Sequence, residues 1–265
     1  MDPLPRPWQV LLAYLLAFAM IVCTSLLAAG VVIAMYPDEP ERVVLQGLPG
    51  LLAGGIASSA ALALTLLLVV RPLEPSRLRL LPGRETGPAL VVMVVGVLSL
   101  GQSLDSLTTL VGLDDRGAMP EIRRALSQAV GPDLFAAVVV IGLLAGTAEE
   151  LFFRGYMQTA LRQRWRPLPA VALTSLCFGL LHLEWIHAAL AFVLGLYLGF
   201  LVELTGSALP AVVCHVVNNG LFTLLTALAG TVEGTTPNLA LAIGGPVVFV
   251  GCVLWLRRTF APAPG

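Results

Sequence analysis

GLLAGTAEELFFRGYMQTALR, residues 142–162, is an apolar run that carries two adjacent acids and an arginine near its middle. The charged residues are Glu149, Glu150 and Arg154. Charges inside a membrane span are costly, and they usually pair with one another or mark a functional path. The run therefore predicts a membrane helix whose polar side chains have a specific task.

The rest of the chain shares this apolar character. Of its 265 residues, 57% are hydrophobic and 12% are charged, which is about half the charged fraction of an average soluble domain. Apolar segments of the length needed to cross a bilayer recur at residues 8–35, 48–70, 88–110, 133–160, 167–184, 186–204, 207–229 and 237–256. We therefore expect an all-α, polytopic membrane protein with about eight transmembrane helices, in which residues 1–265 form a single membrane domain.

All fifteen basic residues are arginines, and their placement predicts an orientation. The arginines of the N-terminus, of segments 71–84 and 162–166 and of the C-terminal tail fall on one side of an eight-span arrangement and outnumber the others. This favours an N-in/C-in topology, with segment 113–131 as an amphipathic piece on the outer face. The lack of lysine indicates a GC-rich coding bias, hence a bacterial inner membrane, and it excludes lysine-dependent phosphate loops and Schiff-base chemistry.

Helical spacing separates the three charges of the opening run. Glu150 and Arg154 are four residues apart with the acid first, which is the favourable order for an ion pair within one helix. Glu149 is rotated by about 100° from Glu150, so it lacks that local partner. Net charge is −1, which argues against nucleic acid as a partner of the chain.

Two further polar pairs lie on later apolar segments. Phe178 and His182 are four residues apart, and so are His215 and Asn219. At 1.5 Å per residue, Glu149, His182 and Asn219 lie ~18, ~22 and ~16 Å from the expected cytoplasmic ends of their helices. Because these depths overlap, the sequence predicts one buried, water-containing pocket formed by three helices.

Such a set of side chains suits amide hydrolysis. Glu149 and His182 could activate a shared water molecule, while His215 and Asn219 could stabilise the oxyanion of a tetrahedral intermediate. The alternative is a zinc site made of Glu149, His182 and His215, because zinc binds imidazole and carboxylate groups. An amide is an uncommon zinc ligand, so the residues favour a metal-free enzyme without a cofactor.

The other polar side chains are expected to be structural. His187 falls close to the outer interface, and Glu184 and Glu203 lie at segment ends, where solvation by headgroups costs little. The alternative for Glu203 is a place at the mouth of the pocket. Asn218 faces about 100° away from Asn219, which favours a role in helix packing.

Three motifs resemble those of a known family. EELFFR (149–154) matches EExxxR, FGLLH (178–182) matches FxxxH, and HVVNN (215–219) matches HxxxN. In this order on successive helices, they are similar to the CPBP family, which includes Rce1-type CAAX prenyl endopeptidases and bacterial bacteriocin-processing or self-immunity proteins. The resemblance covers about residues 130–230, which we expect to be the catalytic core.

The resemblance implies an intramembrane endopeptidase of the glutamic type, with a metalloprotease as the alternative. Its water-activating pair and oxyanion site would be formed by Glu149, His182, His215 and Asn219, supported by Glu150, Arg154 and Phe178. The substrate would be a membrane-associated protein or peptide that is cut near its C-terminus or leader. Bacterial members similar to this chain include a myxosortase-like group that trims C-terminal sorting tails, as well as peptide-maturing and immunity proteins.

The competing interpretation is a non-catalytic membrane scaffold, an immunity protein or a small transporter with a polar vestibule, since buried charge also marks transport paths. No inverted repeat is visible, and the ionisable residues are concentrated in one half of the chain, which disfavours a transporter. The expected partners are thus a protein or peptide substrate and the lipid bilayer.

Overall fold

The chain folds into a helical bundle, and the computed structural model describes residues 5–261. Every regular element in this range is a helix. Seven helices are long and apolar enough to cross a membrane: α1 (Pro7–Met35), α3 (Leu48–Val69), α4 (Gly87–Leu110), a composite helix over Gly131–Arg162, α10 (Trp185–Thr205), α11 (Leu209–Ala229) and α12 (Thr235–Thr259). The all-α, multi-pass membrane architecture is therefore confirmed.

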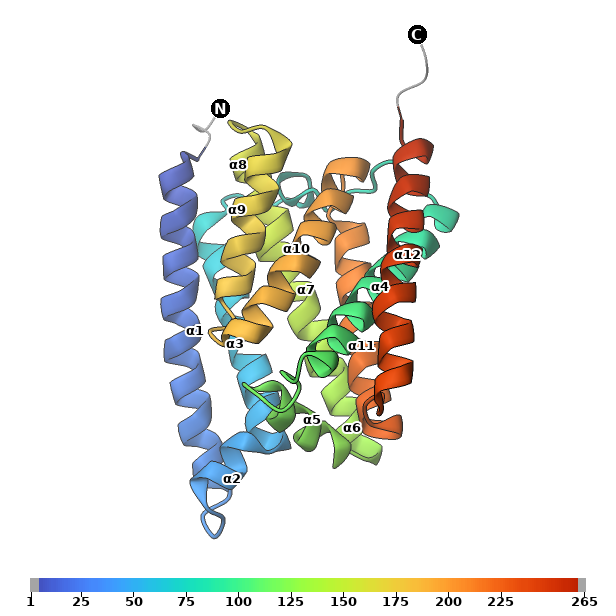
Figure 1. Cartoon of the computed structure of the whole chain (residues 1–265). Helices are drawn as coiled ribbons and strands as arrows, with labels where there is room; N and C mark the ends of the chain where they lie inside the picture. The colour runs from blue at the N-terminus through green and yellow to red at the C-terminus, as the bar shows by residue number, and fades with distance from the viewer. Residues whose placement is uncertain (1–4, 262–265) are drawn as a thin grey trace.

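The eighth expected span is shorter than the others. It forms α9 (Pro167–Leu180), whose 14 residues extend over ~21 Å, less than the ~30 Å hydrocarbon core of a bilayer. Figure 1 shows α9 and α10 as a hairpin whose turn lies part-way down the bundle. The same view places the start of α1 and the end of α12 at one end of the bundle.

Short helices cover both ends of the bundle. The 3₁₀ turn η1 (Pro75–Leu78) lies between α3 and α4, whereas α2 (Glu41–Gln46) and α5 (Met119–Ser127) lie at the opposite end. The expected amphipathic piece within 113–131 is α5, which contacts α2 and α11. Gln46 of α2 donates a hydrogen bond of 2.9 Å to Glu121 of α5, so these two helices are joined at this end.

The composite helix changes its hydrogen-bonding pattern around the two glutamates. It runs through α6 (Gly131–Ala137), the π-helical η2 (Val138–Ala145), α7 (Gly146–Glu150), the π-helical η3 (Leu151–Gln158) and α8 (Thr159–Arg162). The wider π turns redirect side chains relative to a regular α-helix, and they occur frequently at functional sites. Glu149 and Glu150 therefore lie on a short α-helical segment between two π-helical ones.

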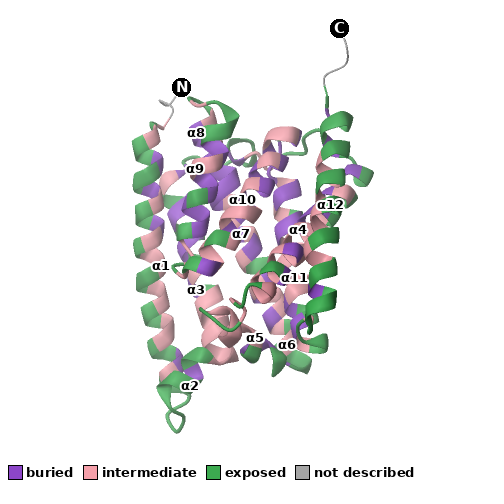
Figure 2. Cartoon of the chain, viewed as in Figure 1, coloured by how far each residue is buried: buried purple, intermediate pink, exposed green. Residues whose placement is uncertain are grey.

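Two apolar clusters flank the centre of the bundle. One joins α1, α3, the composite helix and α9, and the other joins α4, α10, α11 and α12. Figure 2 shows the buried residues concentrated on the central helices, while α1 and α12 expose their outer faces. The composite helix approaches α11 closely, because a Cβ at Gly142 would lie 2.9 Å from the Cα of Gly220, and such small residues permit tight contacts between membrane helices.

Candidate active site

Glu150 is the centre of a buried network that joins three helices. Its Oε1 accepts a hydrogen bond of 2.7 Å from Nη1 of Arg154 and one of 2.8 Å from Nδ1 of His215. The side chains of Glu150 and Arg154 are fully buried, and the ion pair expected between them is confirmed. Arg154 also donates to the carbonyl of Gly195 on α10, at 3.0 Å, and its guanidinium lies 4.7 Å from the ring centre of Phe178 on α9.

The contact with Glu150 determines which nitrogen of the His215 ring carries the hydrogen. A carboxylate facing an arginine only accepts hydrogen bonds, so Nδ1 of His215 carries the proton. The other nitrogen, Nε2, then faces Oε2 of Glu149 at 3.6 Å. This distance is too long for a hydrogen bond, so the carboxylate of Glu149 lies beside the imidazole without being engaged by it.

His182 is held in a similar way at the end of α9. Its Nδ1 lies 3.0 Å from the carbonyl oxygen of Phe178, which only accepts, so Nδ1 is the protonated nitrogen and Nε2 is the free base. The ring of Phe178 packs edge-on against both histidines, with centroids 5.1 Å from His182 and 5.7 Å from His215. Phe178 thereby contacts both imidazoles and the guanidinium of Arg154.

These histidines line a cavity of about 650 Å³ between α4, α10 and α11. That volume is typical of sites for small molecules or short peptide segments. Asn219 also lines it, and its Oδ1 accepts a hydrogen bond of 3.2 Å from Asn218, which leaves the amide nitrogen of Asn219 to donate to a ligand. The rest of the lining is mostly apolar and reaches Met119 and Val232, near the end of the bundle where α5 lies (Figure 1).

The structure thus brings most of the expected site residues together. Phe178, His182, His215 and Asn219 line one cavity, and Glu149 touches it through His215. The sequence predicted that Glu149 would act together with His182. Within residues 5–261, however, Glu149 forms an ion pair with His215, and none joins it to His182.

The cavity lining includes three further residues whose place there was not predicted. From the sequence, structural roles were assigned to two of them, and the third was not singled out. Asn218 and His187, both expected to be structural, line it. So does Asp105 of α4, which is paired with Arg123 of α5. An acid within an apolar segment is itself a signal of function, so Asp105 could have been found from the sequence.

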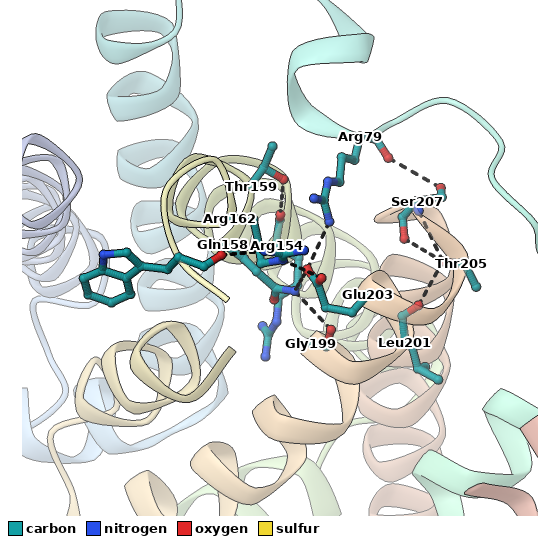
Figure 3. A network of polar contacts seen from close by, with 11 residues as sticks. Arg79, Arg154, Gln158, Thr159, Arg162, Gly199, Leu201, Glu203, Thr205 and Ser207 are labelled. Carbon is teal, nitrogen blue, oxygen red and sulfur yellow. Dashed lines mark hydrogen bonds and ion pairs between the residues drawn. The ribbon is translucent and has the colours of Figure 1, made fainter. Parts of the chain in front are cut away.

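A ladder of polar contacts continues from Arg154 towards the end of the bundle that carries η1 (Figure 3). Along the composite helix, Arg154, Gln158 and Arg162 are spaced by four residues. Arg154 and Gln158 donate to the carbonyls of Gly195 and Gly199, each at 3.0 Å. These partners are also spaced by four residues, on α10, so the ladder sets the register between the two helices.

Glu203 of α10 is the last rung. It accepts hydrogen bonds from Arg162 at 2.6 Å, from Gln158 at 3.0 Å and from Arg79 at 3.1 Å. Figure 3 shows these donors converging on one carboxylate from the composite helix and the loop before α4. Glu203 is not among the residues that line the cavity, and its contacts favour the structural role expected from its place at a segment end.

The comparison with protein families adds an independent observation. Residues 131–221 match the family model of the type II CAAX prenyl endopeptidases, described as Rce1-like. This part of the chain is an Rce1-like domain. It contains all three motifs and every residue of the Glu150 network, and the family implies a CAAX-type intramembrane protease. Neither the curated proteins nor the solved structures gave a match.

Proposed function

We propose that the chain is an intramembrane endopeptidase that hydrolyses a peptide bond of a membrane-associated substrate, near its C-terminus or leader. The observation that carries this proposal is the free carboxylate of Glu149, 3.6 Å from an imidazole whose far nitrogen is bonded to Glu150. This arrangement lies in an Rce1-like domain, beside a cavity large enough for a short segment of peptide.

The water molecule would be bound between the carboxylate of Glu149 and Nε2 of His182. Glu149 takes a proton from the water as its oxygen forms a bond to the scissile carbonyl carbon. His182 can accept a hydrogen bond at Nε2 because its Nδ1–H is donated to the carbonyl of Phe178. When the C–N bond breaks, the proton held by Glu149 passes to the leaving amine, so that no net proton is lost or gained.

The oxyanion would be stabilised by His215 and Asn219. Asn219 lines the cavity one turn beyond His215 on α11, and its amide nitrogen would donate to the oxyanion. Nε2 of His215 donates when the ring is doubly protonated, with Nδ1–H held by Glu150. Donors that are fixed before the reaction stabilise a developing negative charge strongly, because no reorganisation is needed.

We propose a mechanism without zinc in preference to the alternative zinc site. Among the described residues, no three His, Cys, Asp or Glu side chains are grouped so that they could hold a metal ion. Nδ1 of His215 is bonded to Glu150 and that of His182 to a carbonyl; this leaves both Nε2 atoms open, an arrangement that suits water activation and is also usual for metal-binding histidines. We therefore assign every step to side chains of the chain and to water.

The shape of the cavity favours an apolar substrate segment. Leu190, Leu194 and Leu198 of α10 line one wall, and Leu221, Phe222 and Leu225 of α11 line another. A peptide whose hydrophobic residues flank the scissile bond would bury them there.

We propose a bacterial inner-membrane location, with both chain ends in the cytoplasm, on the basis of the arginine distribution.

The test is cleavage of a defined peptide library by the purified protein in nanodiscs. The library consists of synthetic peptides with an apolar C-terminal half, and mass spectrometry identifies the products. We expect cleavage at one class of apolar site by the wild-type protein and a rate at least about 100-fold lower for Glu149→Gln. Cleavage by folded Glu149→Gln at the wild-type rate would overturn the mechanism, and a wild-type protein that cuts neither these peptides nor co-expressed membrane proteins would overturn the function.

A further inference from the structure

All three histidines of the chain lie at one cavity. The sequence contains three histidines, and His182, His187 and His215 all line the space between α4, α10 and α11. Two of them belong to the FxxxH and HxxxN motifs. His187 belongs to none of the three motifs, and the mechanism above gives it no role.

A tight turn brings His187 to this place. Between α9 and α10, the amide of Glu184 donates to the carbonyl of His182 at 2.7 Å, and Leu183 has a φ of +61°. A leucine rarely adopts this left-handed conformation, and residues held in it tend to cluster at functional sites. The turn reverses the chain within four residues, so the first turn of α10 lies against the end of α9.

The start of α10 is fixed as firmly as the turn. The carboxylate of Glu184 caps the helix by accepting hydrogen bonds of 2.9 Å from the amides of both Ile186 and His187. Such a cap satisfies amides that have no partner within the helix and holds the first turn in place. The backbone of His187 is therefore held directly by the residue that follows Leu183.

The side chain of His187 packs on the ring of His182. Their ring centroids are 4.3 Å apart, with the planes inclined by 55°. The Phe178 ring also contacts the His182 ring, edge-on at 5.1 Å, and the Phe178 carbonyl engages Nδ1. A single hydrogen bond at Nδ1 leaves the imidazole free to swing about that bond, so the contact with His187 removes motion that the hydrogen bond allows.

We propose that His187 is a positioning residue, which holds the imidazole of His182 with Nε2 directed at the reacting water. The proposal rests on the proposed function for its catalytic consequence, but the packing role itself is independent of any substrate. His187 acts through its ring, so an aromatic replacement preserves its effect and a small side chain abolishes it.

The first measurement uses NMR of protein labelled with ¹⁵N-histidine in nanodiscs. Three histidines give three sets of imidazole signals, which His182→Gln and His215→Gln assign. We expect the His182 signals to broaden or shift in His187→Ala and to stay in place in His187→Phe. His182 signals that are unchanged in a folded His187→Ala protein would overturn the proposal, whether or not the protein cleaves any peptide.

The second measurement is the rate of peptide cleavage. Misplacement of a catalytic group by about 1 Å can cost up to 100-fold in rate, so we expect His187→Ala to lower kcat about tenfold with little change in KM. His187→Phe should restore most of the rate with an unaltered pH profile. A His187→Phe enzyme as slow as His187→Ala would overturn positioning by the ring and indicate proton transfer instead.

The matched control is Trp185→Ala. Trp185 lies on the same first turn of α10, and 65% of its surface is exposed, so its removal perturbs the turn without touching the His182 ring. Its NMR signals and kcat should equal those of the wild-type protein, and a loss as large as that of His187→Ala would assign the effect to the turn and overturn the role of the ring. Thermal unfolding of each variant confirms that the proteins compared are folded.

Discussion

Two carboxylates on the central helices differ in how many hydrogen-bond partners they have. Glu203 has both oxygens engaged, by Arg79 and Gln158 at one and by Arg162 at the other. Among residues 5–261, the ion-pair contact of Glu149 is the one of 3.6 Å to His215, which is beyond hydrogen-bond distance. A buried charge with all its partners holds helices in register, whereas one without them retains the capacity to take a proton or a ligand.

The comparison extends to the residues beside these carboxylates. Glu150, one position after Glu149, is fully buried and bonded to both Arg154 and His215. The chain thus places two different acids next to each other on different faces of α7. Oε1 of Glu150 accepts two hydrogen bonds, whereas its Oε2 has no partner among the described residues, and Glu149 lies 3.6 Å from His215. The first keeps the arginine and the imidazole in place, and the second is free to react.

The largest expected effect comes from exchanging each acid for its amide. Glu149→Gln should lower the cleavage rate by about 100-fold or more, since general acid–base groups contribute 10²–10⁴-fold. Its melting temperature should stay close to that of the wild-type protein, because Glu149 holds no other group. Glu203→Gln is the matched control, and it should lower the melting temperature while most of the activity remains. A stability loss in Glu149→Gln together with an activity loss in Glu203→Gln would contradict the assignment of a catalytic role to Glu149 and a structural role to Glu203.

Removal of Glu150 should mainly affect stability. Glu150→Ala leaves the guanidinium of Arg154 buried without its ion-pair partner, which costs about 3–5 kcal/mol. Urea unfolding in detergent micelles measures this loss.

A double variant then separates stability from catalysis. Glu150→Leu combined with Arg154→Met replaces both charges by apolar groups and should recover most of the stability. Activity should not return, because Nδ1 of His215 has lost its acceptor. Full activity of this double variant would show that Glu150 does not orient the ring.

A smaller effect is expected where the ladder requires a glycine. A Cβ at Gly199 would lie 2.8 Å from Cγ1 of Val171 and 2.9 Å from Oε1 of Gln158. Gly199→Ala should therefore cost about 1–3 kcal/mol through overpacking. Gly244→Ala on α12 is the control, because a Cβ there meets nothing within 4 Å. Equal melting temperatures for the two variants would contradict the close approach of α10 to the composite helix.

The smallest expected effect is that of metal removal. Because no described group of three ligands could hold an ion, treatment with a strong chelator should leave the cleavage rate unchanged. Elemental analysis of the purified protein accompanies the assay. Stoichiometric zinc whose removal abolishes cleavage would replace the glutamate mechanism by a metal-assisted one.

The sequence was sufficient for the features that depend on one helix at a time. Hydropathy located the spans to within a few residues, and spacing by four residues identified the pair of Glu150 and Arg154. The short length of α9 could not be predicted, because the apolar run continues through the turn to Leu183. The left-handed conformation of Leu183 has no signature, since leucine is not a typical residue for it.

The periodicity of the sequence could not predict the contacts between helices. The bond from His215 to Glu150, rather than to Glu149 alone, depends on the π-helical segments beside α7, which change the angle between successive side chains. The place of His187 depends on the α9–α10 turn in the same way. Overlap of depth among Glu149, His182 and Asn219 correctly suggested that His182 and Asn219 line one cavity, but it could not predict that Glu149 lies beside His215.

Because α9 is short, the histidines at its end are separated from the two ends of the bundle by different structures. On the side of the chain ends, the whole of α9 and the ladder up to Glu203 separate the histidines from the surface (Figure 1). On the other side, only the cavity that reaches Met119 and Val232 intervenes. Water or a peptide segment that enters through this cavity would reach the histidines by a shorter path than one that comes from the side of the chain ends, so the fold gives the chemistry a preferred side.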